Sequence, residues 1–503
     1  METTTSELWL LAAALAVPLL YYLTARKLSA SGSSSKPLPP GPTPLPLIGN
    51  LHNLRGVLHH TLAGLARVHG PVMTVRLGLT TAVVISTKDA AAEAYTKHDR
   101  LLSARAAPDT NSALGFSTRS MIWLPSSDAR WKALRGIQAT HLFSPRGLAT
   151  VHAVRERKVR EIVAYFRSRA GEEVRFGSAV YSGVLNLVSS SFFSMDMAGV
   201  GSEEAYGLRG LVEDLLLAAT KPNVSDLFPL LRPLDLQGLR RWSEKRIGRA
   251  FQILDGIIER RLADYAKTEK RVHGDFLDAL LDLVSSGKMA RDHVTVMLFE
   301  VFMAGSDTMS ITLEWAMAEL LRNPSAMAKA RAELKDVLGD KEAVEEADAA
   351  RLPYLQAALK ESMRLHPVGP LLLPHCAEED GAEVAGYKVP KGAMVIFNVS
   401  AIMRDPAVWE RPCEFVPERF LDREHPYDFR GKEFEFIPFG SGRRLCPGIP
   451  LAERVVPFIL ASLLHAFEWR LPDGVSADEL DTSERFSTAN VLAVPLKVVP
   501  VIN

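Results

Sequence analysis

The sequence predicts a mainly α-helical (α+β) protein with a smaller β-rich lobe. Apolar residues recur mostly at helical spacing between Trp131 and Arg351. Within that region, residues 292–322 form the longest helix candidate, about 30 residues or ~45 Å. Residues 72–85 are instead rich in β-branched side chains and contain Gly78 midway, which is typical of a β-hairpin. The helical region is much the longer, so helices should dominate the fold.

The composition excludes some classes of protein. Lys+Arg and Asp+Glu number 59 each, so no basic excess points to nucleic acid. The three cysteines, Cys376, Cys413 and Cys446, are too few for a disulfide framework, which favours a reducing compartment. With 503 residues and 47% apolar content, the chain can bury a large core, as one large fold or as several domains.

The N-terminus carries an apolar segment, residues 8–23, that predicts a transmembrane anchor. About sixteen residues give ~24 Å of helix, slightly short of a ~27 Å endoplasmic-reticulum core. Arg26 and Lys27 follow the segment, whereas a cleaved signal peptide, the alternative, would have a basic leader. We expect residues 1–27 to be an uncleaved single-pass anchor, with the chain beyond it in the cytosol.

Two further expectations follow from this topology. Residues 28–46 form a polar and proline-rich linker, which should be stiff, and residues 47–503 form the catalytic body. Asn223 and Asn398 begin glycosylation sequons, and we expect neither to carry a glycan, because the body would face the cytosol.

The body begins with the hairpin and continues into a segment rich in small and turn residues, 104–125, which is expected to be a long loop. Trp131 and Arg135 follow on a helix, one turn apart and therefore on one face. On the residues alone they could be a surface aromatic–cation pair.

The long helix at 292–322 contains residues that weaken it. Asp292 is expected to cap it and Asn323-Pro324 to end it. The string Ala304-Gly305-Ser306-Asp307-Thr308 places a glycine, a carboxylate and hydroxyls in an apolar helix. Such rule-breaking is typical of functional sites, where a helix can bulge. The alternative is a kink with a threonine that bonds to its own helix.

After the long helix, residues 355–365 form another helix, in which Glu361 and Arg364 can pair. Extended segments are expected at 368–374, 395–399 and 486–496.

A lone cysteine, Cys446, ends a glycine-bearing loop just before an apolar helix that opens at Leu451. A helix N-terminus and neighbouring arginines both favour a thiolate, the form that binds metal. The alternative is a buried structural cysteine. Gly448 would let the chain lie close to a flat group.

Phe439, Gly442, Arg444, Cys446 and Gly448 fit the pattern Phe-x-x-Gly-x-Arg-x-Cys-x-Gly. The string resembles the haem-binding loop of the cytochrome P-450 monooxygenases, whose cysteine is the axial ligand of haem iron. The resemblance implies that Cys446 ligates the iron of haem b, and that Phe439, Arg444 and Gly448 help to bind the cofactor. It also implies the cytochrome P-450 fold, with a long central oxygen-binding helix and a small β-rich lobe.

Other motifs follow in the family's order. The string around Thr308 resembles the family's oxygen-helix motif, which implies that Thr308 hydrogen-bonds dioxygen and Asp307 relays protons. Met309 departs from the hydroxyl residue common in plant members, and Ser310 follows it.

The resemblance also assigns roles outside the oxygen helix. It implies contacts of Trp131, Arg135 and His375 with the haem propionates. By the same resemblance, Glu361, Arg364 and Arg419 form a buried structural brace.

The resemblance implies a reaction with dioxygen and with electrons from NADPH, delivered by a flavoprotein reductase. Arg130, Lys132, Arg443 and Arg454 are candidate docking residues, although a merely solvated basic face is an alternative. A haem-thiolate isomerase or dehydratase, and a non-catalytic haem-binding sensor, are the other functions considered; Thr308 and the uninterrupted loop argue against them.

The substrate-pocket candidates are mostly apolar and predict a hydrophobic substrate; they are Phe116, Phe299, Ala304, Val368, Leu371 and Val491. The segments 446–454 and 402–406 resemble the plant geraniol-hydroxylase-like subfamily, and most of all its cereal branch that hydroxylates labdane-related diterpenes for phytoalexins. A monoterpenoid, alkaloid or phenolic substrate is the alternative.

Overall fold

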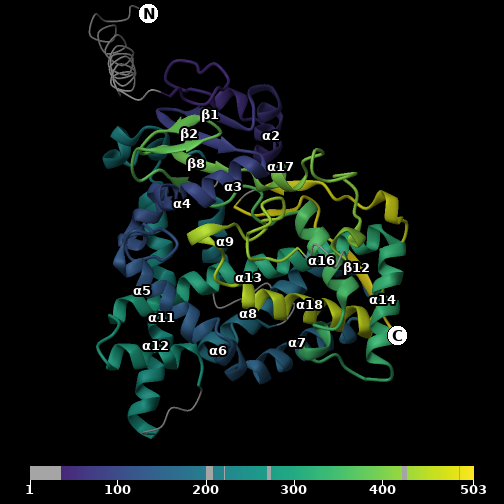
Figure 1. The fold of residues 1–503 in the computed structure, drawn as a ribbon. Helices are drawn as coiled ribbons and strands as arrows, with labels where there is room; N and C mark the ends of the chain where they lie inside the picture. Colours follow the sequence, from purple (N-terminus) through teal and green to yellow (C-terminus); the bar gives the residue numbers. More distant parts are fainter. Residues whose placement is uncertain (1–35, 200–207, 220, 269–273, 422–426, 487) are drawn as a thin grey trace, which may run out of the picture.

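The computed structural model describes residues 36–199, 208–219, 221–268, 274–421, 427–486 and 488–503. A β-rich lobe around β1, β2 and β8 lies at the top of Figure 1, and a larger helical part lies below it. The anchor expected at residues 1–27 lies outside the described residues.

Long helices build the helical part; they are α5 (Ala129–Ile137), α7 (His152–Ser168), α8 (Phe176–Phe193), α9 (Leu208–Ala219), α11 (Leu239–Thr268), α12 (Phe276–Ser285), α13 (Arg291–Arg322), α14 (Pro324–Leu338), α16 (Pro353–Leu365) and α18 (Ile449–Ala466). Shorter helices and turns connect them or cover the sheet; they are η1 (Leu51–Asn53), α2 (Leu58–His69), α3 (Lys88–Lys97), α4 (Asp99–Leu102), η2 (Asp109–Thr118), η3 (Gln138–Leu142), α6 (Pro145–Thr150), α10 (Val224–Leu227), η4 (Pro229–Leu234), α15 (Glu346–Ala349), α17 (Val399–Met403), η5 (Pro417–Phe420), η6 (Gly442–Arg444) and η7 (Ala477–Glu479).

The main sheet has the strand order β1-β2-β8-β5-β3. Its strands are β1 (Val72–Leu77), β2 (Thr80–Ile85), β3 (Ala104–Arg105), β5 (His375–Cys376) and β8 (Met394–Phe397). The first two form an antiparallel hairpin, and β8 joins β2 in parallel. Smaller sheets hold β4 (Val174–Arg175), β9 (Phe467–Arg470) and β12 (Lys497–Ile502), the pair β6 (Ala382–Val384) with β7 (Tyr387–Val389), and the pair β10 (Glu484–Phe486) with β11 (Asn490–Leu492).

Helix α13 crosses the middle of the helical part, where α8 packs along it (Figure 1). Gly305 lies at this contact, where a Cβ would meet Val188 of α8 at 3.6 Å, an ordinary van der Waals distance. Most α13 side chains are buried. Among the described residues, α13 and α18 are long and apolar enough to cross a membrane, but both are largely buried core helices of the body.

The hairpin at 72–85 and the helices near 292–322 and 355–365 are confirmed. Three local expectations are wrong. Ala290, not Asp292, is the N-cap of α13; Asp292 lies in the first turn and pairs with Arg119 at 3.5 Å. Residues 104–125 are not simply a loop, because β3 and η2 lie in them. Val399 begins α17 rather than ending a strand, because the Asn398 side chain accepts from the Ala401 N–H at 3.1 Å.

The sequons prove to be poor reporters of topology. Asn398 is fully buried and its amide donates to the carbonyl of His59 at 2.9 Å, while Asn223 is also buried. Folding alone would therefore hide both side chains from modification.

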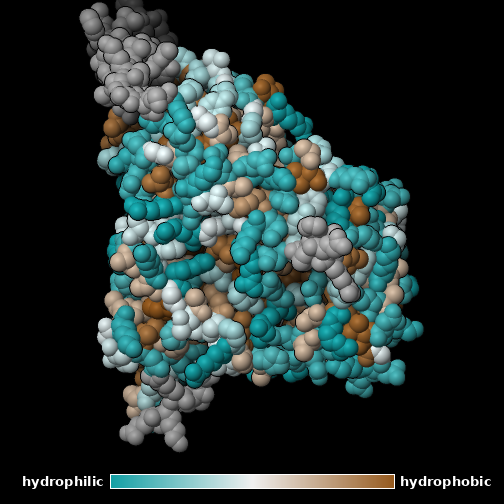
Figure 2. Space-filling view, viewed as in Figure 1, coloured by the Kyte–Doolittle hydropathy of each residue, from teal (hydrophilic) through white to brown (hydrophobic). Residues whose placement is uncertain are grey.

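The outer surface seen in Figure 2 is largely hydrophilic, with hydrophobic residues in small groups, as expected for a body whose core is made by the helices.

Candidate active site

The cysteine loop runs from Phe439 to Gly448 and ends where α18 begins. The N–H of Cys446 donates to the carbonyl of Phe439 at 3.1 Å and closes the loop. Gly442 has a φ of +63°, and a Cβ there would lie 2.4 Å from a carboxylate oxygen of Asp99, so only glycine fits. At Gly448, a Cβ would meet only the Cys446 sulfur, at an ordinary 3.7 Å. No steric clash with the described residues requires a glycine at 448. A cofactor lying flat against the chain there would supply such a reason.

Cys446 is partly buried, and opposing influences act on its thiol. Burial raises the pKa of the Cys446 thiol, whereas the N–H groups of Gly448 and Ile449 and the guanidinium of Arg135 favour the thiolate. The helix N-terminus expected from the sequence is therefore present, but the favourable guanidinium is that of Arg135 rather than that of Arg443 or Arg444, and burial outweighs both influences. A bound metal cation reverses this balance, because a coordinating thiol loses its proton.

Arg444 fastens the cysteine loop to the segment before α5. Its Nε donates to the carbonyl of Ser103 at 2.7 Å and its Nη1 to that of Met121 at 3.1 Å, while Nη2 donates to Leu124. Burial, with repulsion from Arg105, lowers the pKa of Arg444 to about 9. This guanidinium is thus a partly buried cation whose hydrogen-bond partners among the described residues are neutral carbonyls.

Trp131 and Arg135 of α5 belong to the same region and are not a surface pair. Trp131 is buried, and the guanidinium of Arg444, not that of Arg135, lies over its ring, 5.0 Å from the centroid. Arg135 instead donates to the carbonyl of Leu445 in the cysteine loop. The two residues therefore touch the loop from α5.

His375 and Arg105 meet where β5 pairs with β3. Nη1 of Arg105 lies 3.2 Å from Nδ1 of His375, and His375 is 2% exposed. Burial, followed by the charges of Arg105 and Arg444, lowers the pKa of His375 well below its ordinary value. The His375 ring is therefore neutral near neutral pH.

This cluster fits the propionates of a haem. Nε2 of His375 and Nε of Arg105 are buried without a hydrogen-bond partner among the described residues. Burial lowers the pKa of Arg105 to about 10, and Arg105 and Arg444 are cations partly removed from water. Buried donors of this kind call for an anion. Sequence reasoning missed Arg105, because its proximity to His375 arises only from strand pairing across 270 residues.

One turn of α13 faces away from the packed core. Ala304 and Thr308 are exposed, although the residues on either side of this turn are largely buried. The Thr308 hydroxyl donates to the carbonyl of Ala304 at 2.8 Å. α13 is a continuous α-helix here, so the bulge is absent and the threonine bonds to its own helix. Its oxygen keeps lone pairs that can accept a hydrogen bond.

The residues after Thr308 point to the core. Met309 is 5% exposed and Ser310 is 4% exposed. The Ser310 hydroxyl donates to the carbonyls of Ser306 at 2.9 Å and Asp307 at 3.0 Å. Ser310 therefore does not take the place of the hydroxyl residue that Met309 replaces.

Two of the pocket candidates lie together in an aromatic group. The rings of Phe116 and Phe299 are 5.6 Å apart, and Phe251 of α11 lies 6.3 Å from the first and 5.7 Å from the second. Phe251 escaped sequence reasoning because helical spacing does not reveal which distant helix it meets.

The other pocket candidates come from elements joined by hydrogen bonds. The carbonyl of Val368 accepts from the N–H of Asn490, at 2.9 Å, and Val491 follows Asn490 in β11. Leu371 forms an isolated bridge with Asn398. Val368, Leu371 and Val491 are partly buried.

Glu300 is a second buried group that sequence reasoning missed. It lies on α13 one turn before Ala304, and its Oε1 accepts from the hydroxyl of Ser120 and from the N–H of Ile122 at 3.3 Å. Burial raises the pKa of Glu300 to about 7. This carboxyl joins α13 to the segment that Arg444 holds; an acidic residue in an apolar helix was the available signal.

The brace residues are in contact. Glu361 accepts from Arg364 Nε at 2.6 Å and from Arg419 Nε at 3.1 Å, and Glu361 and Arg364 are fully buried. The Arg364 guanidinium lies 5.1 Å from the ring centroid of Trp409.

Tilted and edge-on aromatic ring pairs link this brace to the cysteine loop. Successive centroid distances are 5.9 Å from Trp409 to Phe420, 4.9 Å to Phe436, 5.8 Å to Phe429 and 5.0 Å to Phe439. The brace therefore reaches the loop through packed side chains.

The cytochrome P450 family matches residues 39–494 of the chain. The chain is 77% identical over 502 residues to cytochrome P450 76M5 of Oryza sativa subsp. japonica, covering 99% of each protein. It is 65% identical over 499 residues to the ent-cassadiene C11-alpha-hydroxylase 1 and to the oryzalexin D synthase of that organism, again covering 99% of each protein. The chain therefore belongs to the cytochrome P450 family and is a monooxygenase of that family.

Proposed function

We propose that the chain hydroxylates a labdane-related diterpene of phytoalexin biosynthesis with dioxygen and electrons from NADPH. The observation that carries the reaction type is the basic cluster of Arg105, Arg444 and His375 beside the cysteine loop, in which Nε of Arg105 and Nε2 of His375 are buried without a hydrogen-bond partner among the described residues. The substrate class rests on the names of relatives that cover nearly the whole chain.

The residues that would hold haem b come from four parts of the chain. Cys446 would ligate the iron, with Phe439 and Gly448 along the ring; the propionate partners would be Trp131, Arg135, His375, Arg444 and Arg105. Bound there, haem supplies the oxygen chemistry, and the thiolate favours O–O cleavage. The chain's own part is to exclude water, hold the substrate against apolar walls and supply protons.

We assign proton delivery to the exposed turn of α13. The Thr308 oxygen can accept a hydrogen bond while its hydroxyl donates to the Ala304 carbonyl. If the hydroxyl rotates away from Ala304, Thr308 can instead donate its proton to a group in the pocket. Asp307 precedes it, as a group that can exchange protons with solvent.

Replacing Thr308 with alanine is expected to uncouple NADPH oxidation from product formation. We expect product formed per NADPH to fall by about 100-fold or more, because a positioned proton-transfer group typically contributes about 10²–10⁴-fold. Thr312→Ala is the matched control, because the Thr312 hydroxyl also bonds back within α13, to the Thr308 carbonyl at 2.8 Å. Equal coupling in the two variants would contradict the role of Thr308.

The electrons are proposed to come from a flavoprotein NADPH-cytochrome reductase. Of the candidate docking residues, Lys132 is exposed, while Arg130, Arg443 and Arg454 each have an acidic neighbour. The last two pairs are long, at 3.6 Å, so an acidic partner surface can compete for these arginines.

The substrate is tested by co-expression with a plant reductase and a panel of olefinic diterpenes, beside geraniol, a phenolic and an alkaloid. We expect oxygenated diterpene products that depend on NADPH, and a substrate-induced Soret shift. Oxygenation only of another class would overturn the diterpene assignment, and product formation without reductase and dioxygen would favour an isomerase or dehydratase.

We also propose the membrane topology. Residues 1–27 would anchor the protein in the endoplasmic reticulum, residues 28–46 would link the anchor to the body, and residues 47–503 would work in the cytosol. The linker is held to the body at its end, because the carbonyl of Pro40 accepts from Thr74 at 2.8 Å and that of Pro37 from Lys388 at 3.0 Å.

A further inference from the structure

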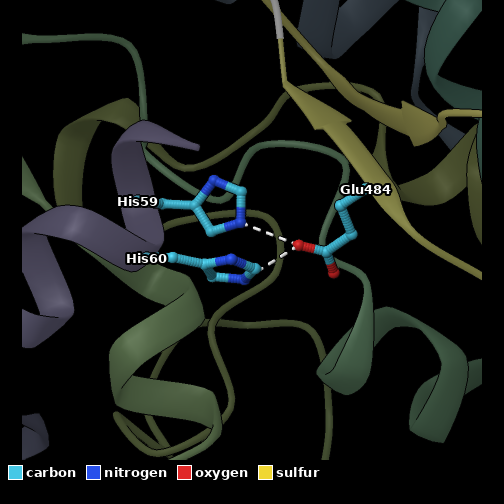
Figure 3. A group of neighbouring side chains, drawn as sticks. All are labelled: His59, His60 and Glu484. Atoms are coloured by element: carbon cyan, nitrogen blue, oxygen red, sulfur yellow. Dashed lines mark hydrogen bonds and ion pairs between the residues drawn. The ribbon is translucent and has the colours of Figure 1, made fainter. Parts of the chain in front are cut away.

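A buried polar network surrounds Glu484, at the start of β10. Figure 3 shows His59 and His60 of α2 directed at one carboxylate oxygen of Glu484. Their Nε2 atoms lie 2.9 and 3.0 Å from Oε2. Oε1 faces Nδ1 of His366 at 3.0 Å and Nη2 of Arg404 at 2.7 Å. The Glu484 side chain is 6% exposed, so donors of α2, α16 and α17 surround a carboxylate removed from water.

The protonation pattern follows from the contacts. His366 also places Nε2 2.8 Å from Glu319 of α13. His366 thus bridges two acidic side chains, one through each ring nitrogen. Arg404 adds a guanidinium to the same Glu484 oxygen. Burial alone would raise the pKa of Glu484, but its hydrogen bonds to His366 and His59 and the charge of Arg404 hold it well below the usual range.

The two histidines and Glu484 also have the donor set of a transition-metal site. His59 argues against that use. Its Nδ1 is buried and has no hydrogen-bond partner among the described residues. A metal on Nε2 would shift the ring proton to Nδ1, where it would have no acceptor. The neutral ring with its proton on Nε2, directed at Glu484, avoids that cost.

The network holds the base of the β10–β11 hairpin, and a second contact holds its other strand. Trp315 of α13 donates from Nε1 to the carbonyl of Asn490 at 2.9 Å. The Trp315 ring also stacks on His366, with centroids 3.8 Å apart and planes at 3°. The N–H of Asn490 donates to Val368. The hairpin is thus fixed to the two segments that carry Val368 and Thr308.

We propose that Glu484 is a positioning residue for the substrate: by fixing the β10–β11 hairpin to α2, α16 and α17, it sets the pocket wall formed by Val368 and Val491. This proposal rests on the pocket assigned under the proposed function. Glu484 touches no substrate itself; it acts through Asn490 and Val491.

The test uses Glu484→Gln. A glutamine must turn its NH₂ either to His59 and His60 or to His366 and Arg404, and each pair consists of donors. The second variant is Trp315→Phe, which removes the N–H donated to Asn490 and keeps a ring against His366. Glu479→Gln is the control, because Glu479 is exposed in η7 and, among the described residues, its side chain bonds only to Ser476.

The readout is the ratio of the dissociation constants of 4-phenylimidazole and imidazole. Both constants are measured by titration of the haem-loaded protein, with the Soret shift as the signal. The phenyl group reaches the pocket wall, whereas imidazole alone does not. We expect Glu484→Gln and Trp315→Phe to weaken phenylimidazole about tenfold more than imidazole, as small displacements of a wall can do. Glu479→Gln should leave the ratio unchanged.

If either variant binds haem but keeps the wild-type ratio of the two dissociation constants, the proposal is overturned. Equal weakening of both ligands counts as this outcome, because a purely structural defect would produce it. If Glu484→Gln fails to fold, Trp315→Phe decides. The assay needs only haem, so its result is independent of whether a diterpene is the substrate. With an identified substrate, a changed ratio of product regioisomers is the additional expected result.

Discussion

Replacing Cys446 with serine is expected to abolish monooxygenase turnover while leaving the body folded. A serine hydroxyl in the same buried place stays protonated and offers no thiolate, so the axial donation that favours O–O cleavage is lost. Removal of an outer partner of a metal ligand typically costs 10–100-fold, so loss of the ligand itself should cost at least about 100-fold in turnover. Product formation with reductase and NADPH measures this effect.

Two features make the experiment decisive. The reduced carbon monoxide complex should lose the red-shifted Soret band that a thiolate ligand gives, independent of any substrate. Cys413→Ser is the matched control, because Cys413 is an exposed free thiol, and the variant should keep both band and turnover. A thiolate-type band in Cys446→Ser, or its loss in Cys413→Ser, would contradict the assignment of Cys446.

Local patterns predicted the parts of the site whose geometry is local. The loop from Phe439 to Gly448 is marked by its own glycines and cysteine, and α13 is confirmed to end at Asn323-Pro324, whose proline begins the next helix. The sequence placed the N-terminal cap of α13 less accurately. Asp292 has the right side chain, but the helix starts one residue earlier, and Asp292 meets Arg119 from another segment.

Residues whose role depends on distant partners were beyond the sequence. Arg105 gains its place because β3 pairs with β5, and Glu484 gains its place because α2, α16 and α17 converge on it. Neither has a neighbouring motif that marks it. Burial was also hard to foresee: it makes His375 neutral and outweighs the groups that favour a Cys446 thiolate. Such effects sum over many atoms that short-range spacing does not report.

Replacing Glu361 with glutamine is expected to give the largest loss of stability. Glu361 also accepts the N–H of Val416 at 2.9 Å, and the change leaves the buried guanidinium of Arg364 without its counter-charge. Breaking a buried pair by removing one partner typically costs ~3–5 kcal/mol. The urea midpoint of the haem-loaded protein, followed by both Soret absorbance and helical ellipticity, measures the loss.

The neighbouring Glu414 supplies the control for this prediction. Its side chain is exposed and pairs with Arg411 at 3.0 Å, so Glu414→Gln should cost less than about 1 kcal/mol. Because aromatic rings connect Trp409, under Arg364, to Phe439 in the cysteine loop, the Soret signal of Glu361→Gln should be lost at lower urea than its helicity. Coincident transitions at the wild-type midpoint would show that the brace does not support the haem side of the fold. Coincident transitions at a lower midpoint would instead show that it stabilises the whole body as one unit.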